Sequence, residues 1–362
     1  MKQFGKTMTK HPFSYPVLEH PAPQLPNKQA ELFSSAWLSE PVFIKPLASE
    51  RDQNFLFKDQ NEKKFVLKVA NSKEPFGVLD LQNKALEHLA LSTNLILPKV
   101  IPDSSSKLIR QEEVNESKHY IRMVSYVDGI PMGDAKQPKD FKVLYFNMGS
   151  FLGLLGQGLK GFTHDNSNHR LLWDVKETES LFEIIEFIKD KKKKDLVKKS
   201  LEYFVEHIKE PLKKLRFQVI HNDMNPDNVL VTHDSSDSVS GMIDFGDMVF
   251  APLVNDLAVA ASYQTVTQQD LLTGTCYLLE GYQKEYPLTK NEIALLPGLV
   301  VNRIAMGLII AEWRATTHPE NKEYILGPIE KTWDVLRQAH QEQPKEIANQ
   351  LIRFLNEREN KL

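Results

Sequence analysis

The segment "VIHNDMNPDNVLVT", residues 219–232, places an imidazole, a carboxylate and a carboxamide between two apolar runs. His221, Asp223 and Asn228 stand in an H-x-D-x-x-x-x-N spacing. In phosphoryl-transfer enzymes this spacing sets a base beside a carboxamide that binds metal. Turn chemistry favours Asn, Asp and Pro, but it does not require an imidazole and two oxygen donors at these offsets. The segment therefore predicts phosphoryl transfer, with Asp223 as the base for the acceptor hydroxyl.

Two roles are open for His221. Its imidazole either organises the loop through backbone hydrogen bonds or transfers protons beside Asp223. We favour the first role, because in enzymes with this motif the aspartate is the base. His221 is still counted among the catalytic residues, since it would hold the loop that carries Asp223. Asp227 lies in the same segment and is interpreted as an ordinary turn residue.

Two other short stretches supply the remaining groups of such a site. "GMIDFGD" (241–247) puts Asp244 at the end of a strand, where a carboxylate can hold Mg²⁺ by oxygen coordination. "FVLKVA" (65–70) puts Lys68 on a strand, as in enzymes whose lysine pairs with nucleotide phosphates. Each stretch alone is weak, since a strand lysine is usually a solvated charge. Their combination, in this order, predicts Asn228 and Asp244 as Mg²⁺ ligands and Lys68 as a phosphate-binding cation.

The composition excludes several other classes of protein. With 45 basic and 48 acidic residues the net charge is -3, so no overall field favours nucleic acid or an anionic membrane. The basic run at 189–199 contains no interleaved aromatic residue and is typical of a solvated helix end. Cys276 is the single cysteine and cannot form an internal disulfide, which fits a reducing cytoplasm.

No segment has the ~18 to 20 uninterrupted apolar residues that a membrane span needs. The most apolar run, "IAMGLIIAEW" at 304–313, is shorter, and we expect it to form a buried core helix. The first sixteen residues contain no apolar stretch typical of a secretory signal. We therefore expect a cytoplasmic protein with no membrane partner.

The elements that must position these residues fall into two groups. Residues 1–28 are rich in proline, which predicts an extended leader without regular helix. Residues 29–127 predict a nucleotide-binding lobe, in which an antiparallel sheet accompanies one helix at 78–91. Its expected strands are 41–47, 54–59, 63–70, 106–113 and 118–127.

Residues 128–362 predict a larger, mainly helical lobe that holds the catalytic and substrate-binding groups. Short strands are expected at 218–220, 228–232 and 240–245, next to the motifs. The fold class is thus α+β with two lobes, and a site is expected in the cleft between them. The expected helices are 139–160, 177–190, 194–214, 255–284, 290–318 and 321–357, the last in two pieces.

From about residue 30 to 340 the chain resembles the aminoglycoside phosphotransferase and choline kinase superfamily, which has a protein-kinase-like fold. Within it, "ASERDQNFLF", "LDLQNKALEHL" and above all "IDFGDM" resemble the hydroxylysine kinase group. The resemblance implies a Mg²⁺-dependent phosphotransferase with an alcohol group as acceptor. It would use ATP or GTP and act on an amino alcohol or hydroxy amino acid, with hydroxylysine as the best single candidate. The alternatives are an aminoglycoside O-phosphotransferase, a homoserine or choline kinase, and an inactive nucleotide-binding module.

The chain departs from protein kinases in ways that agree with a small-molecule acceptor. Gly5 is the only glycine before residue 68, so no G-x-G-x-x-G loop covers the phosphates. The resemblance assigns that position to "SERDQN", with Ser49 and backbone N–H groups. No room exists for an activation segment, because "APLVNDLA" begins four residues after Asp247. The oligomeric state is not indicated.

The resemblance also implies roles for residues outside these motifs. Gln82 aligns with a family glutamate that holds the phosphate-binding lysine, and Asp80 and Glu87 are alternative partners for Lys68. The segment "YIRMVSYVDG" (120–129) is the hinge between the lobes, where backbone groups of Ser125 and Val127 are expected to bind the purine. Met123 either lines the pocket or belongs to the core.

A substrate that carries an ammonium group and a carboxylate needs opposite charges in the cleft. Asp247 is the candidate for the ammonium group. Arg303 and Arg314, eleven positions apart on an apolar helix, are candidates for the carboxylate, with a snorkelling surface role as the alternative for each. The expected partner is thus a small amine or amino acid.

Overall fold

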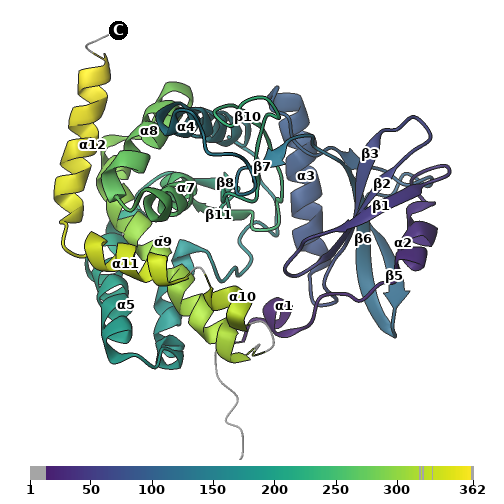
Figure 1. The fold of residues 1–362 in the computed structure, drawn as a ribbon, viewed down its shortest axis with the longest axis horizontal. Coiled ribbons are helices and arrows are strands. Elements are labelled where there is room, and N and C mark those ends of the chain that lie inside the picture. The colour runs from purple at the N-terminus through teal and green to yellow at the C-terminus, as the bar shows by residue number, and fades with distance from the viewer. Residues whose placement is uncertain (1–13, 318, 320–321, 328, 360–362) are drawn as a thin grey trace, which may run out of the picture.

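The smaller lobe is built on a six-stranded antiparallel sheet (Figure 1). The computed structural model describes residues 14–317, 319, 322–327 and 329–359. Strand order is β1-β2-β3-β6-β4, and β5 pairs with β6. The short connections predicted between the first three strands lead to this antiparallel order. The strands are β1 (Val42–Leu47), β2 (Gln53–Lys58), β3 (Lys64–Val69), β4 (Val100–Ile101), β5 (Arg110–Val114) and β6 (Ser117–Ser125).

Alternation along the strands gives this sheet two different faces. Phe65, Leu67 and Met123 point into one apolar cluster, which also receives Ala30 from α2 (Asn27–Ser34). Lys68 pairs with Arg122 across β3 and β6, so these cations share the opposite face. That face looks toward α3 (Phe76–Ser92), which lies between the sheet and the larger lobe (Figure 1).

Helix α3 is attached to the larger lobe as well as to the sheet. Near its C-terminal end, the His88 ring lies 2.9 Å from the Gly158 carbonyl oxygen, and the Ser92 hydroxyl donates to the same oxygen at 3.0 Å. Near its start, Asp80 lies 3.2 Å from His164 Nε2. These contacts fix the position of the helix relative to both lobes.

The larger lobe combines short strands on the side that faces the smaller lobe with a helical bundle beyond them (Figure 1). Two small antiparallel sheets form from β10-β9-β7 and from β11-β8. The strands are β7 (Ile130–Pro131), β8 (Phe217–Ile220), β9 (Val229–Val231), β10 (Val239–Met242) and β11 (Val249–Pro252). The α-helices are α4 (Phe141–Gly158), α5 (Lys191–Tyr203), α6 (Lys209–Leu212), α7 (Leu253–Gln268), α8 (Leu271–Glu285), α9 (Lys290–Thr317), α10 (Lys322–Leu326), α11 (Ile329–Ala339) and α12 (Pro344–Glu359).

Helix α9 is the central helix of this lobe. It has 28 residues, and an 18-residue window of mean hydropathy 2.0 within it is 83% buried. By length and composition it would reach across a bilayer, but it packs on α5, α7 and α12 inside the lobe. The predicted buried core helix is confirmed, and it extends well beyond the run at 304–313.

The structure corrects four of the expected elements. The proline-rich leader contains a short helix, α1 (Pro16–Glu19), since a proline in the first turn lacks only an N–H that would have no partner. Residues 1–13 of that leader lie outside the described residues. The expected helix at 177–190 is mostly 3₁₀, and 255–284 divides into α7 and α8, because Gln269 has φ 57° and Asp270 caps α8. The last expected stretch, 321–357, was expected in two pieces and forms three helices, α10, α11 and α12.

Close packing of α4 against α8 generates a stability prediction. A Cβ on Gly281 would lie 2.0 Å from the Phe146 carbonyl oxygen, so Gly281→Ala must push two backbones apart. We expect a loss of about 1–3 kcal/mol in the free energy of unfolding, measured by urea titration. Gly307→Ala in α9 is the control, because the nearest atom to its Cβ would be 3.6 Å away. Equal effects of the two substitutions would contradict the packing argument.

Candidate active site

The hairpin of β9 and β10 brings two sequence-predicted metal ligands to the same end. Asn228 immediately precedes β9, and Asp244 follows β10. The register pairs Met242 with Val229, and the Ile243 N–H continues the ladder by donating to the Asn228 carbonyl at 2.9 Å. Antiparallel pairing thus brings together two residues that are sixteen positions apart in sequence. It places the carboxamide of Asn228 and the carboxylate of Asp244 side by side at the two strand ends.

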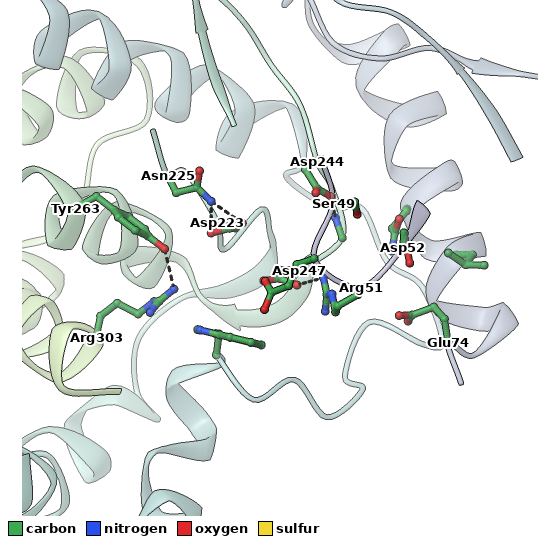
Figure 2. A pocket seen from close by; sticks show the side chains of 15 residues that line it. Ser49, Arg51, Asp52, Glu74, Asp223, Asn225, Asp244, Asp247, Tyr263 and Arg303 are labelled. Atoms are coloured by element: carbon green, nitrogen blue, oxygen red, sulfur yellow. Dashed lines mark hydrogen bonds and ion pairs between the residues drawn. The ribbon is translucent and has the colours of Figure 1, made fainter. Parts of the chain in front are cut away.

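Asp223 sits in the loop before this hairpin and is held by two amides. Asn225 Nδ2 lies 3.0 Å from each carboxylate oxygen of Asp223 (Figure 2). Asn228 Nδ2 lies 2.7 Å from Asp223 Oδ2. Because Asn228 uses its nitrogen here, its oxygen remains for another partner. Sequence reasoning missed Asn225, although its amide lies within the quoted segment, two residues after Asp223.

The environment of Asp223 raises the pKa of its carboxyl group toward 7. Burial raises the pKa of Asp223 to about 7, and the carboxylates of Asp247 and Asp244 act in the same direction. Arg303 and the Asn225 amide oppose this shift. A base works best when its pKa lies near the working pH, so this environment suits proton acceptance from a hydroxyl.

His221 lies beneath this loop and is fully buried. Its Nδ1 accepts the Asp223 backbone N–H at 3.2 Å, and its ring packs edge-on against Phe245 at 4.8 Å. Burial lowers the pKa of His221 to about 4, so the ring is neutral near pH 7. The geometry supports the loop-organising role. It contradicts the alternative of proton transfer, because the ring has no surface exposed to a substrate.

Asp256 on α7 anchors the same loop from below, and sequence reasoning missed it. Its carboxylate accepts the backbone N–H groups of His221 at 3.3 Å and Asn222 at 2.8 Å. Asn222 has φ 64°, and its side chain accepts a hydrogen bond from Asn255 at 2.9 Å. An acidic residue within the apolar stretch "APLVNDLA" was the available signal, since a buried carboxylate needs donors.

Cations of the small lobe meet carboxylates of the large lobe across the cleft. Lys68 Nζ lies 3.7 Å from Asp244 Oδ1, and Lys68 is the main cause that lowers the pKa of Asp244 to about 2. Arg51, in the loop between β1 and β2, lies 2.5 Å from Asp247 (Figure 2). The structure thus brings together Lys68, Asp223, Asn228 and Asp244, as the sequence predicted for the four groups.

None of the three expected partners contacts Lys68. Gln82 and Asn83 instead accept hydrogen bonds from the buried guanidinium of Arg122, which is the residue opposite Lys68 in the sheet. Asp80 pairs with His164, and Glu87 pairs with Lys84. The assignment of Gln82 as the partner of Lys68 is therefore wrong for this structure. The longer side chain of Arg122, on β6, contacts Gln82 on α3 instead.

The hinge requires one correction. Met123 lies in the apolar cluster on the sheet face opposite Lys68, so it does not line the pocket, and strand alternation puts Val124 on the Lys68 face instead. The Ser125 N–H and hydroxyl both bond to the Lys99 backbone at 2.8 Å. Purine binding by the Ser125 carbonyl and the Val127 N–H stays a prediction.

A cavity of about 150 Å³ lies between the lobes at this point (Figure 2). Six of its lining residues were predicted from the sequence, and they come from five separate stretches of chain. Most of the others are polar, and Arg51, Glu74 and Tyr263 among them gave no sequence signal. The cavity is lined by Ser49, Glu50, Arg51, Asp52, Glu74, Leu79, Gln82, Trp173, Asp223, Asn225, Asp244, Gly246, Asp247, Tyr263 and Arg303.

The two candidate arginines of α9 have different positions. Arg303 lines the cavity, is 7% exposed, and lies 3.4 Å from the Tyr263 hydroxyl (Figure 2). Its Nε is buried without a hydrogen-bond partner among the described residues. Arg314 pairs instead with Glu50 and does not line the cavity, so the substrate role predicted for Arg314 is not supported.

The donor set at the hairpin end fits Mg²⁺. Mg²⁺ prefers oxygen ligands and takes only one or two from protein, with the rest from water and phosphate. Asp244 supplies a carboxylate that stays ionised, and Asn228 supplies the oxygen that its amide leaves free. Within the described ranges no cluster of three or more His, Cys, Asp or Glu is placed to hold a metal.

The anchoring carboxylate generates a prediction about pH and stability. Burial raises the pKa of Asp256 to about 6, despite the two N–H donors. The folded state therefore holds this proton more tightly, so the stability it contributes is present below pH ~4 and is lost as the pH rises toward 6. The advantage of the wild type over Asp256→Asn in unfolding free energy should fall by about 3 kcal/mol across this range. Denaturant titrations at several pH values would measure it.

Asp227→Asn is the matched control, because Asp227 is an exposed carboxylate of the same loop. Its difference from the wild type should stay constant with pH. A constant difference for Asp256→Asn as well would show that Asp256 is ionised throughout.

Comparison with known proteins agrees with this geometry. A model described as "Phosphotransferase enzyme family" matches residues 44–288. A hydroxylysine kinase of Xenopus laevis is 26% identical over 348 residues, covering 90% of this chain and 92% of that protein. A microcompartment-associated aminopropanol kinase and an amicoumacin kinase in complex with AMP-PNP and Ca²⁺ each have a TM-score of 0.63, at 16% and 15% identity, covering 87% of this chain and 97% of theirs. The fold is the two-lobed, protein-kinase-like one, and the chain belongs to the phosphotransferase enzyme family, whose members act on hydroxyl groups.

Proposed function

We propose that this protein is a Mg²⁺-dependent kinase of a hydroxy amino acid, with hydroxylysine as the best single acceptor and ATP or GTP as donor. One observation carries the proposal: Lys68, Asp223, Asn228 and Asp244 converge on one cleft from three separate places in the chain. The similarity to the Xenopus laevis hydroxylysine kinase, which extends over both lobes, supports the choice of acceptor.

In this proposal Asp223 is the general base. The acceptor hydroxyl oxygen attacks the γ-phosphorus, its proton passes to an Asp223 carboxylate oxygen, and the bond between the γ-phosphorus and the bridging oxygen breaks. The products are a phosphate ester and ADP or GDP. The amides of Asn225 and Asn228 hold the carboxylate in one orientation, and the buried His221 holds its backbone.

Asn228 and Asp244 would hold Mg²⁺, which supplies charge neutralisation at the phosphate oxygens. Lys68 pairs with Asp244 in the nucleotide-free protein, at 3.7 Å. This separation is long for a direct hydrogen bond, so the ammonium group can turn to a phosphate without losing a short contact. Ser49 lines the same cavity from the loop that replaces a glycine-rich one.

The acceptor would lie between Asp247 and Arg303. The carboxylate of Asp247 suits an ammonium group, and the guanidinium of Arg303 suits a carboxylate. Arg303 is buried beside Tyr263 with one N–H unused among the described residues, which favours a ligand with acceptor oxygens. This feature favours an amino acid over an amino alcohol, which remains the second candidate because of the fold shared with an aminopropanol kinase.

The base assignment predicts the effect of Asp223→Asn. The amide keeps the shape but cannot take the proton, so phosphoryl transfer to hydroxylysine should fall about 10²- to 10⁴-fold. Turnover with ATP and with GTP would be measured by phosphate incorporation into the acceptor. Asp227→Asn in the same loop should leave turnover unchanged. Retention of most activity by Asp223→Asn would remove Asp223 from the mechanism.

The carboxylate site predicts a selective effect of Arg303→Gln. Loss of the guanidinium should raise KM for hydroxylysine at least tenfold and leave KM for the same molecule without its carboxyl group nearly unchanged. Arg314→Gln is the matched control on the same helix, because Arg314 pairs with Glu50 and does not itself line the cavity. If Arg303→Gln affects both acceptors equally, Arg303 does not bind the carboxylate of the acceptor, and the amino alcohol becomes the better candidate.

A further inference from the structure

The loop between β1 and β2 carries an arginine across the cleft. Arg51 leaves the small lobe and places Nη2 2.5 Å from Asp247 Oδ1, with side chains only 19% and 13% exposed (Figure 2). Asp247 is also the carboxylate proposed to receive the ammonium group of the acceptor. In this structure that carboxylate therefore already has a cation.

Gly246 makes room for this arginine. A Cβ on Gly246 would lie 3.0 Å from Arg51 Nη2 and 3.0 Å from Asp244 Oδ1. The guanidinium thus rests over a residue without a side chain, between the proposed metal ligand Asp244 and Asp247. This position borders the place where the phosphates would meet Asp244 and Lys68.

The charges around Arg51 explain why it stays in the cleft. Asp247, Glu74, Asp52 and Asp244 all stabilise its positive charge against the cost of burial, and its pKa remains above the ordinary value. Glu74 has its pKa raised to about 7, chiefly by burial. A guanidinium has five N–H donors and matches the geometry of phosphate as well as that of carboxylate. A bound triphosphate would therefore compete with Asp247 for Arg51.

We infer that Arg51 is a phosphate-binding residue that blocks the acceptor site until nucleotide is bound. Without nucleotide, Arg51 occupies Asp247 and excludes the ammonium group of the acceptor. When the nucleotide binds, Arg51 moves to its phosphates and releases Asp247. The inference rests on the proposed function, and its consequence is that nucleotide raises the affinity for the acceptor, and acceptor raises the affinity for nucleotide by the same factor.

Isothermal titration of the full chain tests this inference. We expect hydroxylysine to bind the wild type at least tenfold more tightly in saturating Mg²⁺ and AMP-PNP than without nucleotide. In Arg51→Gln, hydroxylysine without nucleotide should bind nearly as tightly as to the nucleotide-loaded wild type, because Asp247 is free. AMP-PNP should bind this variant about tenfold more weakly, and Arg51→Lys should recover part of that loss.

Asp80→Asn is the matched control. It breaks another contact between the lobes, the one with His164, at a place that does not line the cavity. If the Arg51–Asp247 pair were only a latch between the lobes, Asp80→Asn and Arg51→Gln would change the two affinities alike. We expect Asp80→Asn to keep the coupling between nucleotide and acceptor.

Unchanged AMP-PNP affinity in Arg51→Gln, or no gain in its nucleotide-free affinity for hydroxylysine, would overturn the inference. If the proposed function is wrong, the wild type itself fails to bind the acceptor. This result differs from one that is seen only in Arg51→Gln. A wild type that binds AMP-PNP but neither hydroxylysine nor its decarboxylated form would overturn the proposed acceptor and the coupling together. The AMP-PNP affinity of Arg51→Gln would still decide whether Arg51 binds phosphate.

Discussion

Antiparallel pairing of β9 with β10 is the constraint on which the site depends, because it sets Asn228 and Asp244 at the same end of one hairpin. The loop that precedes the hairpin must then hold Asp223 against Asn228, and it does so through short amide contacts. Asp256 holds that loop in turn. Its carboxylate accepts the backbone N–H of Asn222, in place of the backbone acceptor that this residue cannot have in its left-handed conformation. The catalytic geometry is therefore produced by hydrogen bonds between segments of the chain.

Electrostatics across the cleft follows from the same arrangement. Carboxylates that serve metal and substrate are costly to bury without partners. In this structure the small lobe provides those partners, with Lys68 against Asp244 and Arg51 against Asp247. Arg122 stays on the sheet and is satisfied by α3, so it does not compete for them. The acidic groups are thus neutralised before any ligand arrives, and ligands must exchange with protein cations.

Local patterns in the sequence accounted for much of this fold. Strand alternation, motif spacing and polar connectors predicted the small sheet, the helical lobe and the four central groups, because each depends on residues close in sequence. Contacts that depend on register were beyond such reasoning. The face of Met123 and the partner of Gln82 both follow from the pairing of Lys68 with Arg122, which no single strand reveals. The break between α7 and α8 was also hidden, since Gln269 adopts its left-handed conformation without a glycine.

The absence of a glycine-rich loop has a physical consequence that extends to binding. A glycine-rich loop offers backbone N–H groups, which carry no net charge and need no counter-ion when the nucleotide is absent. A loop that offers the Arg51 guanidinium instead brings a full charge, and a buried charge must be paired at all times. The nearest partner is Asp247, on the opposite lobe. Replacing backbone donors by an arginine therefore couples the phosphate-binding loop to the acceptor side of the cleft, because one carboxylate satisfies the arginine before nucleotide binds and is released afterwards.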